Sequence, residues 1–259
     1  RCVFCYQTDK ELTQKKNGHM GVMSLDLFKK IVDELEGKVE AITLASRGEP
    51  LVNKQLPEML QYLKGKFLAV KINTNASLLN DNLCHAILKA DIQTLVFSAD
   101  AAEEPLYSKL RVQGDLETVL TNIQRFNVIK LMHYPSSKII TRVSGVKYNS
   151  DQNINSMEAF WGDLVDQVMF VDYNPWENVY NSKKTNIDES CSDLWRRMFI
   201  WWDGLVAPCD VDYLIKLSKE TVLNNSVAEI WQGNMYTDLR KKHLEDRSCI
   251  EPCSRCTVV

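Results

Sequence analysis

Seven of the eight cysteines lie near the two ends of this 259-residue chain. Cys2 and Cys5 form a C-x2-C pair at the beginning. Five more crowd the last quarter of the chain: Cys191, Cys209, Cys249, Cys253 and Cys256. Thiolates grouped at such short spacings are soft ligands, suited to iron–sulfur clusters or zinc. The cysteines therefore predict metal sites rather than the disulfide framework that is typical of short secreted chains.

The bulk composition is that of an ordinary globular protein. Apolar residues make up 45% of the chain and charged residues 25%, so a sizeable buried core is expected. The net charge is −3, without the basic excess that marks nucleic-acid-binding proteins. No apolar run reaches the length of a membrane-spanning helix. We therefore expect a cytoplasmic protein that binds neither nucleic acid nor a membrane.

The elements that must position the chemistry alternate between helix and strand over the first three-quarters of the chain. Apolar residues at helical spacing predict helices near residues 25–35, 56–63, 83–88, 116–126 and 154–161. Short apolar and β-branched runs predict strands at 40–45, 67–73, 94–99, 139–144 and 168–172. This alternation indicates parallel βαβ units, in which ligands bind at the carboxyl ends of the strands.

Polar residues that are unusual for a core occupy those predicted strand ends. They are Gly48, Glu49, Asn73, Asn75, Ser98, Asp100, Arg142 and Asp172. A carboxylate such as Glu49 could pair with a cationic ligand, and Gly48 beside it permits close backbone approach. Each polar residue also has an ordinary interpretation, as a solvated turn residue, a cap or a member of a structural ion pair.

The pattern changes near residue 178. A polar stretch at 178–188 is followed by a predicted β-hairpin at 198–207, with Asp203-Gly204 as its turn, and by a predicted helix at 226–243. We therefore predict two domains, an α/β domain over residues 1–177 and a small α+β domain over residues 178–259 that holds the five late cysteines.

The order of these motifs resembles that of the radical S-adenosylmethionine (SAM) superfamily over nearly the whole chain. The cluster loop of that family, C-x3-C-x2-C with an aromatic residue before its last cysteine, matches Cys2, Phe4 and Cys5, and the resemblance puts its first cysteine ahead of Arg1. The family's G-G-E-P motif corresponds to Arg47-Gly48-Glu49-Pro50. Its T-N-G-x-L-L segment corresponds to Thr74-Asn75-Ala76-Ser77-Leu78-Leu79.

The resemblance implies the fold and the first cofactor site. The fold would be a partial (β/α)6 TIM-like barrel whose first strand precedes Arg1. Cys2 and Cys5 would hold a [4Fe–4S] cluster. SAM would be bound by Phe4, Gly48, Glu49, Pro50, Asn73, Asn75, Ser98, Asp100 and Arg111. Glu49 would receive the methionyl ammonium of SAM, and Arg111 its carboxylate, a task suited to a bidentate guanidinium.

The tail resembles the SPASM/twitch extension found in the same superfamily. Its spacing suits the shorter, twitch version, which holds one auxiliary [4Fe–4S] cluster. Because four ligands suffice, we choose Cys191, Cys209, Cys253 and Cys256, with Cys249 as a substitute or bystander. A zinc site and a second auxiliary cluster are the alternatives for this tail.

The resemblance also implies a reaction. The first cluster would donate an electron to SAM, and the resulting 5′-deoxyadenosyl radical would abstract a substrate hydrogen. The auxiliary cluster would accept an electron in the net oxidation of a small alcohol, sugar or aminocyclitol, and flavodoxin or ferredoxin would serve as the electron donor. Arg142 is the candidate catalytic residue. The alternatives are an enzyme that modifies a ribosomal peptide or partner protein, and a non-catalytic iron–sulfur or zinc-binding module.

Overall fold

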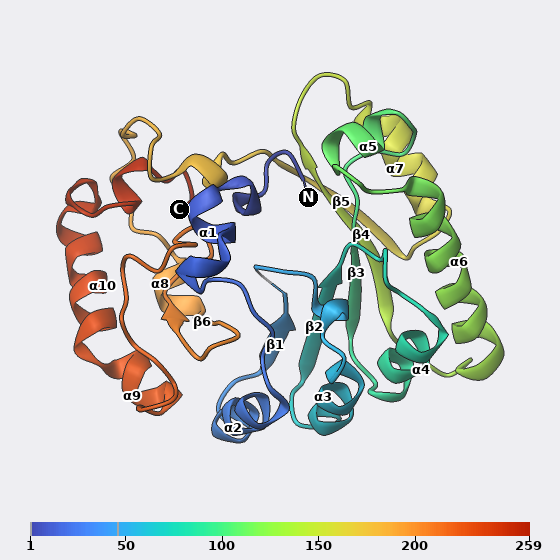
Figure 1. Ribbon diagram of the computed structural model, residues 1–259, viewed down its shortest axis with the longest axis horizontal. Coiled ribbons are helices and arrows are strands. Elements are labelled where there is room, and N and C mark those ends of the chain that lie inside the picture. Colours follow the sequence, from blue (N-terminus) through green and yellow to red (C-terminus); the bar gives the residue numbers. More distant parts are fainter. Residues whose placement is uncertain (1, 46) are drawn as a thin grey trace. The chain divides into compact units, whose positions relative to one another are not determined.

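The computed structural model describes residues 2–45 and 47–259 (Figure 1). The chain divides into two compact units. Unit 1 consists of Arg1–Val3 and Leu35–Tyr173, and unit 2 of Phe4–Glu34 and Asn174–Val259. The chain therefore passes from one unit to the other between Val3 and Phe4, inside the Cys2–Cys5 pair.

Unit 1 is built on a five-stranded parallel sheet with the strand order β1-β2-β3-β4-β5. The strands are β1 (Ala41–Leu44), β2 (Ala69–Thr74), β3 (Thr94–Ser98), β4 (Ile140–Lys147) and β5 (Gln167–Asp172). Strands that are neighbours in the sheet are also consecutive in the chain, which is the topology of successive βαβ units. All five predicted strands are present, so the α/β prediction is confirmed.

Helices connect these strands. They are α3 (Leu56–Leu63), α4 (Asp81–Lys89), α5 (Leu106–Leu110), α6 (Leu116–His133) and α7 (Ile154–Gly162). Three of them begin at residues of the expected capping type: the side chains of Asn80, Asp115 and Asn153 each accept a hydrogen bond from the backbone N–H three residues on. These caps and the apolar periodicity explain why the predicted helices 56–63, 83–88, 116–126 and 154–161 form.

The core of unit 1 lies between the sheet and its helices. Ile72, Leu95 and Phe97 on the strands are fully buried. The ring of Phe97 packs edge-on against Phe126 of α6, with the ring centroids 6.1 Å apart. Removing each such side chain from water contributes about 1.5–3 kcal/mol, so the inward-facing residues stabilise the sheet that carries the polar strand ends.

Unit 2 contains short helices and one hairpin. Its elements are α1 (Lys10–Thr13), α2 (Leu25–Leu35, whose last residue belongs to unit 1), α8 (Asp193–Arg196), β6 (Phe199–Ile200), β7 (Val206–Ala207), α9 (Val227–Gln232) and α10 (Asn234–Asp246). The predicted hairpin is confirmed, with Gly204 in the left-handed region at φ 84°. The single helix predicted at 226–243 is wrong. Gly233 is extended there, at φ −73° and ψ 173°, and separates α9 from α10.

The N-terminal segment Phe4–Glu34 is held within unit 2 by contacts with residues far along the chain. The rings of Tyr6 and Tyr213 stack with their centroids 5.3 Å apart. Trp176 donates its indole N–H to the carbonyl of Phe4 at 3.1 Å, and Trp202 donates to His19 at 3.2 Å. Such pairings between distant segments leave no local sequence signal.

No helix in the described part of the chain is long and apolar enough to cross a membrane.

Candidate cofactor and cluster sites

Glu49 joins the loop after β1 to the end of β2. Its Oε1 accepts hydrogen bonds from the Thr74 hydroxyl at 2.6 Å and the Leu51 N–H at 3.1 Å, and its Oε2 accepts one from the Asn75 N–H at 2.8 Å. Burial raises the pKa of Glu49, and the hydrogen bonds from Asn75 and Thr74 oppose that rise. A carboxylate offers about four acceptor positions, so these three bonds leave room for a cationic ligand.

The segment after β2 is fixed by two side chains of α6. Asn122 donates to the carbonyl of Ala76 at 2.8 Å, and Arg125 donates to the carbonyl of Leu79 at 3.1 Å. Ala76 has a left-handed backbone with φ 61°. The family's glycine adopts this conformation at lower cost, which explains why glycine is usual at this position of the motif.

Asp100 and Arg111 form a buried ion pair. Arg111 Nη2 lies 2.6 Å from Asp100 Oδ2, and Asp100 Oδ1 accepts the N–H of Val146 at 2.8 Å. Cys2 forms an antiparallel bridge with Arg111. The structure therefore brings Cys2, Asp100 and Arg111 together. Arg111 Nε is buried and has no hydrogen-bond partner among the described residues, so this pair retains a donor for an anionic ligand.

The other residues predicted to bind SAM occupy varied positions. Ser98 ends β3 and is half-buried, and Asn73 lies in β2 with its Oδ1 buried and unpartnered within residues 2–45 and 47–259. Gly48 and Pro50 flank Glu49. Phe4 is buried in unit 2.

Arg142 does not lie at the carboxyl end of a strand, so its predicted position is wrong. The polar residues Ser144 to Lys147 continue β4 beyond the end predicted from the apolar run, which leaves Arg142 near the beginning of β4. Its Nε and Nη2 donate to Gln167 Oε1 of β5 at 2.9 and 2.5 Å. These hydrogen bonds join the side chain of Arg142 to β5, and the catalytic role stays a prediction.

Cys2 and Cys5 are both half-buried, Cys2 in unit 1 and Cys5 in unit 2. Cys5 directly precedes a 3-10 turn, η1 (Tyr6–Thr8). Its Sγ accepts a hydrogen bond from the N–H of Gln7 at 3.4 Å. An acceptor role of this kind suits a thiolate ligand, which binds metal through the same sulfur.

Four of the five late cysteines line one cavity in unit 2: Cys191, Cys209, Cys253 and Cys256. Cys191 precedes α8, Cys209 follows β7, and the other two flank a 3-10 turn, η6 (Cys253–Arg255). Burial raises the pKa of each of these thiols. Among the described residues, no three His, Cys, Asp or Glu side chains converge on one point that could hold a single metal ion.

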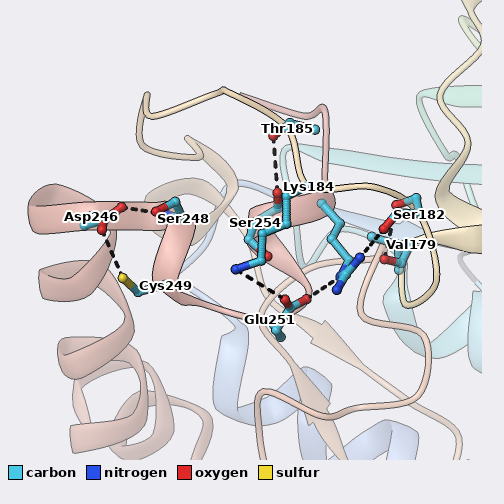
Figure 2. Close-up of polar contacts among 10 residues, drawn as sticks. Val179, Ser182, Lys184, Thr185, Asp246, Ser248, Cys249, Glu251 and Ser254 are labelled. Carbon is cyan, nitrogen blue, oxygen red and sulfur yellow. Dashed lines mark hydrogen bonds and ion pairs between the residues drawn. The ribbon is translucent and has the colours of Figure 1, made fainter.

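Cys249 is exposed and does not line that cavity. Figure 2 shows its sulfur directed at Asp246, to whose Oδ2 it donates a hydrogen bond at 2.9 Å. The same view shows Thr185 against the carbonyl of Ser254, a backbone hydrogen bond of 2.8 Å that secures the turn carrying Cys253 and Cys256. The arrangement separates Cys249 from the four cavity cysteines, and the choice of cluster ligands stays a prediction.

Two basic residues, Arg247 and His243, and one carboxylate, Asp193, also line the cavity. Arg247 is 1% exposed and donates to the carbonyls of Cys256 (2.8 Å), Cys253 (3.2 Å) and Glu189 (3.1 Å). None of the ion pairs found among the described residues includes it. A buried cation without an ion-pair partner is costly. Four thiolates around an iron–sulfur core carry net negative charge, so such a cluster would compensate the buried guanidinium of Arg247.

His243 is the second basic residue and is 2% exposed. Burial, and then the charge of Arg247, lowers the pKa of His243 to about 4. The sequence analysis singled out neither residue. Their spacing of four residues, directly before the cysteine run, is the signal that could have directed attention to them.

Two parts of the chain match models of known protein families. Residues 1–141 match the model of the radical SAM superfamily, and residues 191–257 match the SPASM iron–sulfur cluster-binding domain. The chain belongs to the radical SAM superfamily. Its C-terminal part is a SPASM-type domain, as the sequence predicted.

Individual relatives support the same fold. A probable GTP 3′,8-cyclase of Methanococcus maripaludis is 30% identical over 127 residues, which cover 48% of this chain and 40% of the cyclase. The structure of BtrN in complex with AdoMet and 2-DOIA has a TM-score of 0.63 at 16% identity, covering 100% of this chain and 87% of BtrN. Streptococcus suis SuiB bound to its precursor peptide SuiA has a TM-score of 0.71 at 15% identity, covering 99% of this chain and 66% of SuiB.

These matches confirm the predicted fold class and cofactors. The α/β unit is a TIM-like partial barrel of the radical SAM type, joined to a SPASM-type domain. The superfamily uses a [4Fe–4S] cluster and SAM, and the SPASM domain carries an auxiliary iron–sulfur cluster.

Proposed function

We propose that this protein is a radical SAM oxidoreductase in which the auxiliary cluster accepts an electron during the net oxidation of a small alcohol, sugar or aminocyclitol. The observation that carries the proposal is the cavity lined by Cys191, Cys209, Cys253 and Cys256. A [4Fe–4S] cluster held by four thiolates has every iron occupied by a protein ligand. Such a cluster has no open position for substrate, which favours electron transfer over substrate ligation.

In this proposal the residues of unit 1 hold and orient SAM. Glu49 offers its remaining acceptor position to the methionyl ammonium, and Arg111 offers its unpartnered Nε–H to the carboxylate while Asp100 fixes the guanidinium. Asn73, Asn75 and Ser98 supply polar contacts at the strand ends. When bound, the reduced first cluster and SAM supply the hydrogen-abstracting radical chemistry of the superfamily.

Cys2 and Cys5 are proposed as ligands of the first cluster. The four cavity cysteines are proposed as ligands of the auxiliary cluster, whose negative charge Arg247 would balance. A low-potential protein such as flavodoxin or ferredoxin is proposed as the electron donor to the first cluster.

A second candidate is the modification of a peptide. The structural likeness to SuiB, solved with its precursor peptide, has the higher TM-score, 0.71 against 0.63 for BtrN, which was solved with 2-DOIA. Likeness at 15–16% identity establishes only the fold, so the two substrate classes must be separated by experiment.

Anaerobic reconstitution of the full-length protein with iron and sulfide tests the cluster assignment. We expect about eight irons per chain, corresponding to two clusters. Cys191→Ala, Cys209→Ala, Cys253→Ala and Cys256→Ala should each lower the content to about four, whereas the matched control Cys249→Ala should keep about eight. A Cys249→Ala protein that loses the same share of its iron would contradict the ligand choice.

The reaction itself is tested with substrates deuterated at carbon. After reduction in the presence of SAM, we expect deuterium in 5′-deoxyadenosine with an aminocyclitol or sugar and none with peptides. Deuterium transfer from peptides alone would favour the second candidate. A reduced protein loaded with both clusters that forms no 5′-deoxyadenosine would contradict the enzyme proposal.

A further inference from the structure

We infer that His243 donates a hydrogen bond from Nε2 to a sulfur atom of the auxiliary cluster and that, with the charge of Arg247, it raises the reduction potential of that cluster. This inference rests on the proposed ligation by the four cavity cysteines. It assigns His243 as a residue that tunes the reduction potential by direct contact with the cluster, without ligating a metal.

The orientation of the imidazole follows from its backbone partner. The N–H of Cys191 points at His243 Nδ1 over 3.4 Å, so Nδ1 is the acceptor. An Nδ1 that accepts a hydrogen bond carries no proton, so the ring proton lies on Nε2. This hydrogen bond ties the ring to a cluster cysteine and leaves Nε2–H as the free donor.

The Nε2–H donor makes no hydrogen bond to the described residues. Nε2 is buried and finds no hydrogen-bond partner among the described residues, while His243 lines the same cavity as the four cysteines. Leaving a buried donor unsatisfied is destabilising. A cluster sulfur in the cavity would remove that cost, because sulfide and thiolate sulfurs accept hydrogen bonds.

Two hydrogen bonds fix His243 relative to the segment that carries Cys191. His243 lies in the last turn of α10, and its own carbonyl accepts the hydroxyl of Ser190 at 2.8 Å. Ser190 directly precedes Cys191, so the hydroxyl bond and the Cys191 N–H bond join one ligand segment to α10 at two points.

Arg247 acts on the same cluster through charge and through the backbone. Its guanidinium binds the carbonyls of Cys253 and Cys256, two of the proposed ligands. One-electron reduction adds a negative charge to the cluster. Both a nearby cation and an N–H donor stabilise the more negative state, so both raise the potential.

The potential is measured by a redox titration followed by electron paramagnetic resonance. The titration uses full-length protein in which Cys2→Ala and Cys5→Ala remove the first cluster and leave the auxiliary signal alone. His243→Leu removes the donor. We expect about a tenfold shift of the equilibrium toward the oxidised cluster, equivalent to about 59 mV for one electron. His243→Gln, which keeps an amide N–H, should recover part of the shift.

Two controls accompany the titration. His85→Leu, in unit 1, should leave the auxiliary potential unchanged, because His85 bonds to Tyr134 and does not line the cavity. Arg247→Lys should keep the charge and shift the potential less than Arg247→Met does.

A spectroscopic measurement on protein with an unaltered His243 keeps the inference testable if His243→Leu fails to fold. Labelling histidine with ¹⁵N should produce a hyperfine coupling to the reduced auxiliary cluster, and His243→Gln should remove it. Absence of this coupling, or an unchanged potential in an iron-loaded His243→Leu protein, overturns the inference. Failure of the proposed ligation is a different result, since it appears as cavity-cysteine variants that keep all their iron.

Discussion

At the scale of single residues, burial separates eight identical side chains into different chemical environments. Cys84 is completely buried on α4, and desolvation, followed by the charge of Asp81, raises its pKa to about 12. Cys249 is exposed, and its pKa is raised by the hydrogen bond to Asp246. The four cavity cysteines share a wall with two basic residues. The thiol group gives every cysteine the same possible reactions, and its burial and neighbouring side chains determine which of them each cysteine can undergo.

Asp246→Asn should increase the rate at which iodoacetamide alkylates Cys249. The carboxylate of Asp246 favours the protonated thiol, so its removal lowers the pKa of Cys249 and raises the reactive thiolate fraction at pH 8. Mass spectrometry of the folded, cluster-loaded protein measures the rate, and Cys84 should stay unlabelled throughout. Glu245→Gln, a neighbouring exposed carboxylate paired with Lys241, is the matched control. Equal rates for Asp246→Asn and the parent protein would refute the pKa argument.

At the scale of elements, the sheet of unit 1 depends on one close backbone approach. Gly145 lies in β4, where a Cβ would come within 2.0 Å of the Ala99 carbonyl oxygen and 2.8 Å of the Phe170 ring. The backbone after β3 cannot move away without breaking a hydrogen bond of 2.9 Å, which the N–H of Ala99 donates to the carbonyl of Ser144. Glycine at this position lets β4 continue to Lys147 beside the strand end that carries Asp100.

Gly145→Ala should therefore destabilise the protein by roughly 1–3 kcal/mol, the usual cost of overpacking. Denaturant unfolding followed by far-ultraviolet circular dichroism measures the change. Gly162→Ala serves as the control, because a Cβ at the end of α7 meets nothing within 4 Å and should be neutral or slightly stabilising. A Gly145→Ala protein as stable as the Gly162→Ala protein would show that the strands can separate at this point without cost.

At the scale of the whole molecule, the two units differ in the structure that stabilises each of them internally. Unit 1 has a parallel sheet with a continuous apolar core. Unit 2 has a two-stranded hairpin, short helices and the cysteine-lined cavity. A two-stranded hairpin contributes little stability by itself. Metal binding contributes directly to folding free energy in such cases.

Loss of the auxiliary cluster should lower the thermal midpoint of unit 2 before that of unit 1. Five of the six tryptophans, all except Trp161, belong to unit 2, so tryptophan fluorescence reports mainly on it. Comparing Cys191→Ala with Cys249→Ala, we expect a lower fluorescence midpoint in the former, by about 2–8 °C for each kcal/mol lost. Circular dichroism of the helices should retain a second, higher transition. Coincident transitions at the same temperature in both variants would argue against a stabilising cluster in unit 2.

The amino-acid sequence by itself determined the parts of this protein that depend on neighbours in the chain. The five strands, most helices, the hairpin and the cysteine spacing follow from periodicity and turn residues, which act over a few positions. The superfamily motifs predict roles for Glu49, Arg111 and the late cysteines, and the predicted fold and cofactors are confirmed.

Only the tertiary structure decided what depends on distant segments. It joined Phe4–Glu34 to the C-terminal part, moved Arg142 from a strand end to the beginning of β4, and paired Asp100 with Arg111. It also divided the predicted C-terminal helix at Gly233, where a Cβ would lie 2.7 Å from the carbonyl oxygen of Glu229. The tertiary structure also placed His243 and Arg247 in the wall of the cysteine-lined cavity. The burial of a side chain and the identity of its hydrogen-bond or ion-pair partner depend on packing between distant segments. Local patterns of residue type therefore do not predict them.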